Sequence, residues 1–277
     1  MYYIMTTPKI VFIVPYRDRE PQKFFFSKHM SYILENHDPS DYEIYFSHQC
    51  DNRTFNRGAM KNIGFLAIKQ KYPDDYKKIT FVFNDVDTIP YKKLFDYETT
   101  EGTIKHFYGF KFALGGIVSI TGSDFEKMNG FPCYWGWGHE DNALLQRSRR
   151  SQLRIDRDIF YELGNPNILH LFDGMDRIVT GLESKRFVND NGYDGIKTIR
   201  NLHTTISLDS EFKNTYFINA EQFDTFIPYN GDNYYTMDLR DTQQKQLKQI
   251  INQRNIPFLT KSNEKHQNQF KSRFSLF

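Results

Sequence analysis

Residues 9–19, which read Lys-Ile-Val-Phe-Ile-Val-Pro-Tyr-Arg-Asp-Arg, decide the fold class. Their apolar part is continuous and rich in β-branched residues, which predicts a strand buried on both faces of a parallel sheet. Similar runs at 42–46 and 80–83 predict two more strands. Apolar residues at helical spacing over 20–36 and 58–72 place a helix after each of the first two strands. This alternation predicts an α/β protein with a doubly wound sheet.

Polar residues follow these strands where each of them ends. Ligands of doubly wound sheets bind beyond the carboxyl ends of the strands. Arg17 and Arg19 follow the first strand, and Arg57 precedes the second helix. Guanidinium groups at such places suit a phosphate or a uracil, although a solvated strand end is the alternative interpretation.

Two carboxylates, Asp85 and Asp87, follow the strand at 80–83. In an extended segment they point to the same side, and we expect them to share a divalent cation through oxygen ligands. Such a cation neutralises the charge that grows on a diphosphate leaving group. The alternative interpretation is an ordinary turn, in which the Asp-x-Asp pattern is common.

From about residue 97 to 140 the rhythm of strands and helices breaks, and glycines and aromatic residues dominate. This composition predicts a mobile wall of a binding site. A helix is expected from near Glu140 to about Arg150. Glu140 and Asp141 follow Trp-Gly-Trp-Gly-His, which suits a general base, although carboxylates also favour helix starts as dipole partners. His170 ends another apolar strand and is either structural or a ligand of an Mn²⁺-type ion.

Amino-acid composition and net charge limit the kinds of molecule that this protein is expected to bind. The chain has 277 residues and a net charge of +2, which argues against a dedicated nucleic-acid binder. Two cysteines build no disulfide framework and favour a reducing, cytosol-like compartment. No signal peptide and no run of roughly 18 apolar residues is seen, so we expect no membrane span. We expect one domain over 1–240, followed by a C-terminal helix and polar tail over 241–277.

In their order along the chain, five segments resemble the β-1,4-galactosyltransferase family (glycosyltransferase family 7). The matching stretches are 12–19, 55–58 with 62–65, 83–90, 115–119 and 129–141. The last is the most specific, because it is long and carries both tryptophans in Asn-Gly-Phe-Pro-Cys-Tyr-Trp-Gly-Trp-Gly-His-Glu-Asp. The resemblance spans roughly residues 9–205.

The resemblance implies a GT-A fold with a mixed sheet and a flexible Gly/Trp loop. It also implies an inverting, metal-dependent transfer of a galactose-like hexose from a UDP-sugar to a carbohydrate hydroxyl, in a β-1,4 link. By the same resemblance, Asp141 is the catalytic base, Glu140 positions the sugars, and Asp87 and His170 bind Mn²⁺. The donor is held by Pro15, Arg17, Arg19, Phe55, Arg57, Asp85, Val86 and Trp137.

Departures from the family pattern leave alternatives open. Asn142 stands where a third carboxylate is usual, and Ala113 stands where an aromatic residue often crowds the donor sugar. Ala113 therefore motivates an N-acetylhexosaminyltransferase as a rival, and a catalytically silent carbohydrate-binding protein is a second one. The third metal ligand stays open, with Asn167 and Asp173 as candidates. Residues 191–198 resemble a stretch of the same family in its branch that acts on xylose.

Overall fold

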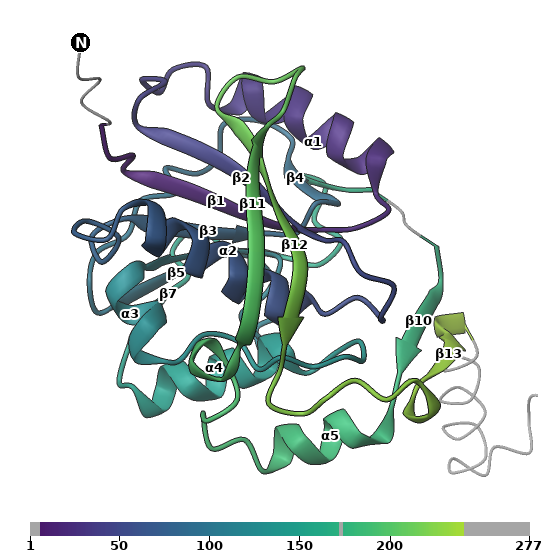
Figure 1. Cartoon of the computed structure of the whole chain (residues 1–277). Coiled ribbons are helices and arrows are strands. Elements are labelled where there is room, and N and C mark those ends of the chain that lie inside the picture. Colours follow the sequence, from purple (N-terminus) through teal and green to yellow (C-terminus); the bar gives the residue numbers. More distant parts are fainter. Residues whose placement is uncertain (1–5, 172–173, 241–277) are drawn as a thin grey trace, which may run out of the picture. The chain divides into compact units, whose positions relative to one another are not determined.

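The computed structural model describes residues 6–171 and 174–240 (Figure 1). The chain divides into two compact units. The larger takes in the described part of Met1–Gly174 together with Ile178–Tyr235, and the smaller takes in that of Met175–Arg177 and Thr236–Phe277. The predicted C-terminal helix and tail, 241–277, lie outside the described residues, so the boundary at 240 stays a prediction.

A mixed sheet of nine strands, counted within the described residues, forms the centre of the larger unit. Its order is β11-β12-β2-β1-β3-β6-β5-β7, with β8 beside β5. Strands β12, β2, β1 and β3 are parallel neighbours, whereas β6 runs antiparallel to both β3 and β5. The strands are β1 (Ile10–Tyr16), β2 (Tyr42–Gln49), β3 (Thr80–Asn84), β5 (Thr103–Gly109), β6 (Ile117–Thr121), β7 (Arg154–Asp156), β8 (Tyr161–Glu162), β11 (Arg200–Leu208) and β12 (Thr215–Asp224).

Helices and short two-stranded sheets complete the described structure. The α-helices are α1 (Glu20–Ile33), α2 (Arg57–Lys71), α3 (Gly122–Lys127), α4 (Glu140–Arg150) and α5 (Gly181–Val188). The 3-10 turns are η1 (Ile196–Thr198) and η2 (Gly231–Asn233). The small sheets pair β4 (Thr88–Pro90) with β9 (Ile168–His170), and β10 (Asp176–Val179) with β13 (Tyr235–Asp238). The helices expected over 20–36, over 58–72 and from Glu140 to Arg150 are confirmed.

Strand β1 lies between β2 and β3 and is buried on both faces (Figure 1). Val11 and Ile13 belong to the apolar cluster that includes α2, while Phe12 and Val14 belong to the cluster that includes α1. Successive side chains of a strand point to opposite faces, so the two helices cover opposite faces of the sheet. The close approach of α2 requires Gly64, where a Cβ atom would lie 2.4 Å from a methyl carbon of Ile13. The predicted α/β class with a doubly wound mixed sheet is confirmed.

The expected break between residues 97 and 140 is wrong. Strands β5 and β6 and helix α3 lie in that region, and several of its aromatic rings are core residues. Phe107, Tyr108 and Trp135 are buried, whereas Phe110 and Trp137 are exposed. A segment whose aromatic rings pack in the core can have the same amino-acid composition as a loop that lines a binding site. Composition alone therefore could not tell the two apart here.

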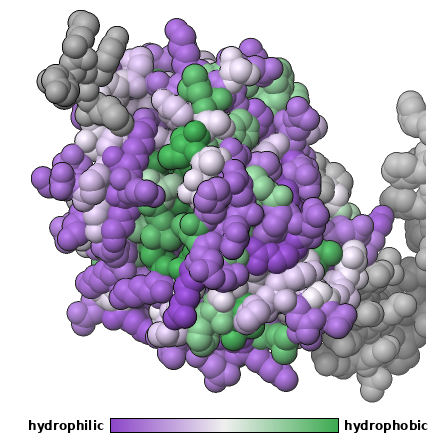
Figure 2. Space-filling view, viewed as in Figure 1, coloured by the Kyte–Doolittle hydropathy of each residue, from purple (hydrophilic) through white to green (hydrophobic). Residues whose placement is uncertain are grey.

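None of the helices within 6–171 and 174–240 has the length and apolar character needed to cross a bilayer. Figure 2 shows a largely hydrophilic face with a hydrophobic patch near its centre. Cys50 and Cys133 are free thiols, the first exposed and the second buried.

Candidate active site

The start of α2 is fixed by a side-chain cap. Asn56 accepts a hydrogen bond from the backbone N–H of Ala59 at 2.8 Å, and its own N–H donates to Gln49 Oε1 at 2.8 Å. The backbone N–H groups of the first turn have no acceptor within the helix, so these hydrogen bonds stabilise the start of α2. The cap therefore sets the position of Arg57, the first residue of α2, beyond the carboxyl end of β3.

Five charged side chains from three parts of the chain meet at this place. Arg57 Nη2 donates to both carboxylate oxygens of Asp85, at 2.7 and 2.8 Å, and Arg57 Nη1 lies 2.9 Å from Glu140 Oε1. Lys61 Nζ donates to Asp141 Oδ1 at 2.9 Å and lies 3.8 Å from Asp85 Oδ1. The ends of β3, the first turn of α2 and the first turn of α4 thus build one cluster, which we call the acid–base cluster.

Burial and neighbouring charges shift the pKa values of Arg57 and Asp85 in opposite directions, and both shifts favour the charged form. Although burial opposes the charged form of Arg57, the carboxylates of Asp85, Glu140 and Asp141 outweigh it and raise the pKa of Arg57. Burial likewise opposes ionisation of Asp85, but the charges of Arg57 and Lys61 hold the pKa of Asp85 below its ordinary value.

Glu140 differs from its neighbours. Burial raises its pKa, and the charge of Arg57 only partly offsets that effect. Its Oε1 is buried and lacks a hydrogen bond of good geometry, in spite of the short distance to Arg57. A buried acceptor that is not satisfied by the protein is available to a ligand hydroxyl.

Asp141 lies against a glycine of the loop between β5 and β6. The backbone N–H of Leu114 donates to the Asp141 carbonyl at 2.9 Å. A Cβ atom built on Gly115 would lie 2.2 Å from Asp141 Oδ2 and 2.5 Å from its Cγ. The carboxylate therefore occupies the space that any side chain at position 115 would need.

The buried side chain of His106 holds the loop between β5 and β6 through backbone carbonyls. Its Nε2 lies 3.0 Å from the carbonyls of Tyr108 and Gly115, and its Nδ1 lies 3.0 Å from Arg157 Nε. Because both carbonyls need a donor and Arg157 is itself a donor, Nε2 carries the proton and the ring is neutral. Burial, helped by the charge of Arg157, lowers the pKa of His106 to about 4.

The expectation that Asp85 and Asp87 lie in an extended segment is wrong, and their sharing of a cation stays a prediction. The N–H of Thr88 donates to the Asp85 carbonyl at 3.1 Å and closes a turn. Asp85 consequently faces Arg57, whereas Asp87 Oδ2 lies 3.5 Å from His170 Nε2. The pairing of β4 with β9, which sets Thr88 opposite His170, brings the two predicted metal ligands together.

The Asp87–His170 pair has suitable chemistry for a metal. A carboxylate and an imidazole are common ligands of Mn²⁺-type ions, and both side chains are partly exposed, at 20% and 47%. Within 6–171 and 174–240 no third Asp, Glu, His or Cys joins them in a metal-binding group. Asp173 lies outside the described residues, and the Asn167 carbonyl accepts a hydrogen bond from the N–H of Tyr91.

The residues expected to hold a nucleotide lie near the ends of β1 and β2. Arg17 Nη1 donates to the Arg53 carbonyl at 2.5 Å, and its guanidinium carbon lies 5.4 Å from the centre of the Phe55 ring. Arg19 stands at the N-cap position of α1 without a side-chain capping bond, and its Nη1 donates to the Asp18 carbonyl at 3.1 Å. Pro15 is buried in β1, and Val86 is buried in the turn between β3 and β4.

The Gly/Trp loop, residues 135–139, is anchored by residues around α5. The N–H of Trp135 donates to Glu183 Oε1 at 3.0 Å, and that of Trp137 donates to the Ile178 carbonyl at 2.7 Å. The ring of His139 stacks on Phe187 at a centroid distance of 5.0 Å. Trp137 is 46% exposed. The flexibility of this loop stays a prediction.

The stretch 191–198, which resembles the xylose-acting branch, packs on the tryptophan-bearing segment. Asn129 Nδ2 donates to the carbonyls of Gly192 and Tyr193, and the N–H of Cys133 donates to Asp194 Oδ2. These contacts fix the segment that leads into the loop.

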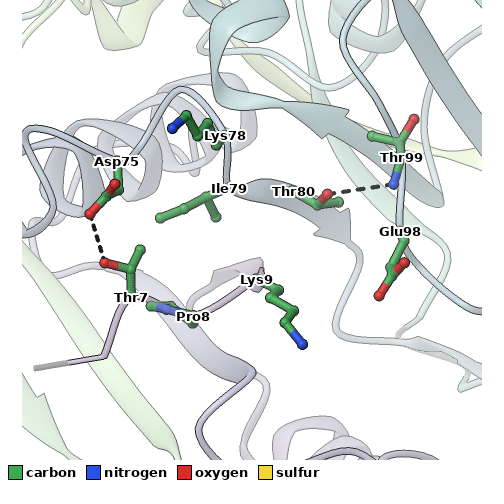
Figure 3. Close-up of a pocket in the computed structure, with 9 residues that line it drawn as sticks. All are labelled: Thr7, Pro8, Lys9, Asp75, Lys78, Ile79, Thr80, Glu98 and Thr99. Carbon is green, nitrogen blue, oxygen red and sulfur yellow. Dashed lines mark hydrogen bonds between the residues drawn. The ribbon is translucent and has the colours of Figure 1, made fainter.

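A separate cavity of about 340 Å³ lies at the amino ends of β1 and β3 (Figure 3). Thr7 Oγ1 donates to Asp75 Oδ2 there, and the N–H of Thr99 donates to Thr80 Oγ1. Lys9, which also lines the cavity, forms an ion pair with Asp41 at 2.7 Å. Since ligands of such sheets bind beyond the carboxyl ends of the strands, we place the active site at the acid–base cluster.

Sequence reasoning missed Lys61, His106 and Arg157. A signal existed for Lys61, because it follows Arg57 by four residues and so lies on the same face of α2. A lysine in a helix is usually a surface residue, whereas this one is 1% exposed. His106 and Arg157 lie 51 residues apart, and nothing in the sequence joins them.

Two models of protein families match the chain. One, the N-terminal region of glycosyl transferase group 7, matches residues 4–99, and the other, the N-terminal domain of galactosyltransferase, matches residues 102–170. Human β-1,4-galactosyltransferase 4 is 32% identical over 169 residues, which cover 54% of this chain and 45% of the relative. The xylosylprotein 4-β-galactosyltransferase of Caenorhabditis elegans is 35% identical over 159 residues, 54% of this chain and 53% of the relative. The chain thus spans about half the length of the curated relatives it matches.

Solved structures show the same fold. The catalytic domain of Drosophila β-1,4-galactosyltransferase 7 in complex with xylobiose has a TM-score of 0.57 and 22% identity, over 78% of this chain and 94% of that one. A mutant of that enzyme in complex with manganese, UDP-Gal and xylobiose has a TM-score of 0.58 and 21% identity, with the same coverage. Because the two family models together match more than half of its residues, this chain belongs to the glycosyltransferase group 7 family of β-1,4-galactosyltransferases.

Proposed function

We propose that this chain transfers a galactose-like hexose from a UDP-sugar to a carbohydrate hydroxyl, with inversion at the anomeric carbon and formation of a β-1,4 link. The observation that carries the proposal is the acid–base cluster, in which the Asp141 side chain is 19% exposed, together with the Asp87–His170 pair, which joins the turn after β3 to the end of β9. A carbohydrate-binding protein without activity needs neither a base nor a metal pair. The relatives' names, and the UDP-Gal and manganese bound by the Drosophila enzyme, support the same reaction.

The donor is assigned to the ends of β1, β2 and β3. Arg17 and Phe55, already in contact with each other, suit the uracil and ribose, and Arg57 suits the diphosphate. Asp85 and Val86 contact the nucleotide-sugar. The remaining donor contacts in the proposal are Pro15, Arg19 and Trp137.

Asp87 and His170 are the proposed protein ligands of Mn²⁺. The ion, when bound, neutralises the charge that develops on the leaving diphosphate. The Asp87 carboxylate also accepts a hydrogen bond from Thr88 Oγ1 at 3.0 Å, which orients the ligand.

In the proposed reaction the acceptor oxygen attacks the anomeric carbon while the bond from that carbon to the diphosphate oxygen breaks. UDP leaves with the electron pair of that bond, and Asp141 takes the proton of the acceptor hydroxyl. A positioned base of this kind contributes ~10²–10⁴-fold in rate. Glu140, whose buried Oε1 has no hydrogen-bond partner, is the proposed acceptor of a hydrogen bond from a sugar hydroxyl.

An aromatic surface beside Asp141 suits the acceptor. The rings of Phe110 and Phe112 stack at a centroid distance of 4.8 Å and are 47% and 63% exposed. Asn142 Nδ2 donates to the Phe112 carbonyl at 2.9 Å, which ties this surface to α4. The C–H face of a sugar packs well on such rings. Xylobiose in both Drosophila structures makes xylosides the first acceptors to test.

A second donor is favoured by Ala113. Its small side chain is buried in the loop that precedes Gly115, so it leaves more room than an aromatic residue would. An N-acetylhexosamine donor is therefore the rival to a plain hexose. A comparison of UDP-Gal, UDP-Glc, UDP-GalNAc and UDP-GlcNAc with Mn²⁺ decides between them.

The substitution Asp141→Asn tests the reaction. We expect transfer to fall by ~10²–10⁴-fold while binding of UDP persists, because the amide keeps the shape but cannot take a proton. Asp96→Asn, at an exposed aspartate paired with Lys105, is the control and keeps wild-type activity. A D141N variant that transfers sugar at the wild-type rate contradicts the assignment of the base. A wild-type protein that binds UDP-sugars and transfers none is instead a binding protein.

A further inference from the structure

Lys61 is a buried cation that the proposed reaction does not yet use. Its side chain is 1% exposed, and its ammonium lies 4.5 Å from the centre of the Phe131 ring. A lysine is rarely buried so completely unless it is paired, because removing an ammonium from water is costly. Its partners are two carboxylates that the proposed reaction does use, Asp141 and Asp85.

The geometry of Asp141 shows what this contact does. Lys61 Nζ donates a hydrogen bond to Asp141 Oδ1 at 2.9 Å, while Asp141 Oδ2 lies next to Gly115. Arg57 Nη2 lies 3.7 Å from Oδ2, too far for a hydrogen bond. One oxygen of the base is thus held by the protein, and the other keeps a lone pair for an acceptor hydroxyl.

Lys61 also balances charge. Asp85, Glu140 and Asp141 bring three carboxylates to the cluster, against the two cations Arg57 and Lys61. Without Lys61, only one cation would face these carboxylates where an anionic diphosphate has to bind. Since its ammonium is buried beneath them, Lys61 acts through the carboxylates and does not touch the substrate.

Resting on the proposed function, we propose that Lys61 is a positioning residue, which fixes the rotamer of the base Asp141 and couples it to the donor-side carboxylate Asp85. Its role differs from that of Arg57, which is partly exposed and can reach an anion directly. Lys61 therefore governs the rate of the bound complex more than the binding of either substrate.

The test compares Lys61→Met with Lys61→Arg. We expect K61M to lower kcat by ~10²-fold, the cost of a misplaced catalytic group, with KM for donor and acceptor nearly unchanged. K61R keeps the positive charge and restores at least a tenth of the lost rate. Lys69→Met is the matched control, because Lys69 lies two turns further along α2, is 37% exposed and pairs with Glu126.

A double variant separates positioning from a structural role. In the D141N background, K61M causes no further loss of kcat if Lys61 acts through Asp141, whereas a structural effect adds to the first loss. Near-ultraviolet circular dichroism checks that each variant is folded, and Lys61→Gln replaces K61M if the latter is not. An active wild type whose K61M variant keeps its kcat, or whose losses add, overturns the inference. A wild type without any transferase activity refutes the proposed function itself.

Discussion

Substitution of Gly115 by alanine is expected to move Asp141, the proposed base, without unfolding the protein. The backbone at this position is outside the left-handed region, so alanine is compatible with its conformation. The added Cβ would lie 2.2 Å from Asp141 Oδ2, whereas ordinary contact begins near 3.4 Å. The carboxylate therefore has to retreat by about 1.2 Å, and a misplacement of ~1 Å costs ~10²-fold in rate.

Stability should change far less than activity. An alanine that fits its backbone stabilises by ~0.4–1 kcal/mol through the unfolded chain, which partly offsets the lengthened contact between Lys61 and Asp141. Initial rates with a UDP-sugar and an acceptor, together with chemical unfolding, measure the two effects. Gly181→Ala is the matched control, because a Cβ atom at Gly181 meets nothing within 4 Å. If G115A kept the wild-type kcat, Asp141 would not be the base, or its position would not matter.

Two further predictions concern protons and metal. The unfolded chain protonates His106 near its ordinary pKa of 6.5, but the folded chain does so only near 4, so stability falls as pH falls through this window and is unaffected above it. Between pH 7 and 5 this residue lowers the free energy of unfolding by ~2 kcal/mol. We expect the His106→Gln variant to lack this contribution when urea unfolding is measured at both pH values. Asp87→Asn is expected to need at least ~10–100-fold more Mn²⁺ for half-maximal transfer, measured by titration of the metal.

Each of these two has an outcome that contradicts it. If wild type and H106Q lose stability in parallel between pH 7 and 5, His106 is not held neutral by the fold. His203→Gln, at an exposed histidine on β11, is the control and follows the wild type. For the metal, a wild-type rate that EDTA leaves unchanged contradicts the Asp87–His170 assignment, and D96N serves as the control.

The parts of the fold that could be predicted from the sequence are those with strong local signals. Strand β1 is a continuous apolar run, and α2 follows a capping asparagine, Asn56, so their positions depend on nearby residues alone. Strand β11 has a mostly exposed, polar sequence, Arg-Asn-Leu-His-Thr-Thr-Ile-Ser-Leu, at the edge of the sheet. Its apolar residues Leu202, Ile206 and Leu208 share one face but are separated by polar residues, and the strand went unpredicted.

The candidate active site also has parts that the sequence predicts and parts that it does not. Asp87, His170 and Asp141 lie in motifs whose order along the chain points to their chemistry, and the structure brings the first two together. Lys61 could not be predicted, because its burial results from the meeting of α2 with α4, 80 residues later. The turn that separates Asp85 from Asp87 was also beyond reach, since one backbone hydrogen bond decides it.

The parallel pairing of β12 with β2 has a consequence for synthesis of the protein. Residues 44–49 of β2 pair with residues 215–220, so one side of β2 stays without its neighbour until β12 has been made. At ~5–20 residues per second, the ribosome needs on the order of 10–35 s to cover that distance. During this time β2 presents unpaired N–H and C=O groups beside Phe46, one of the largest buried rings. The nascent chain is therefore prone to aggregate at the unpaired edge of β2. Only the residues of β12, which are made much later, cover that edge.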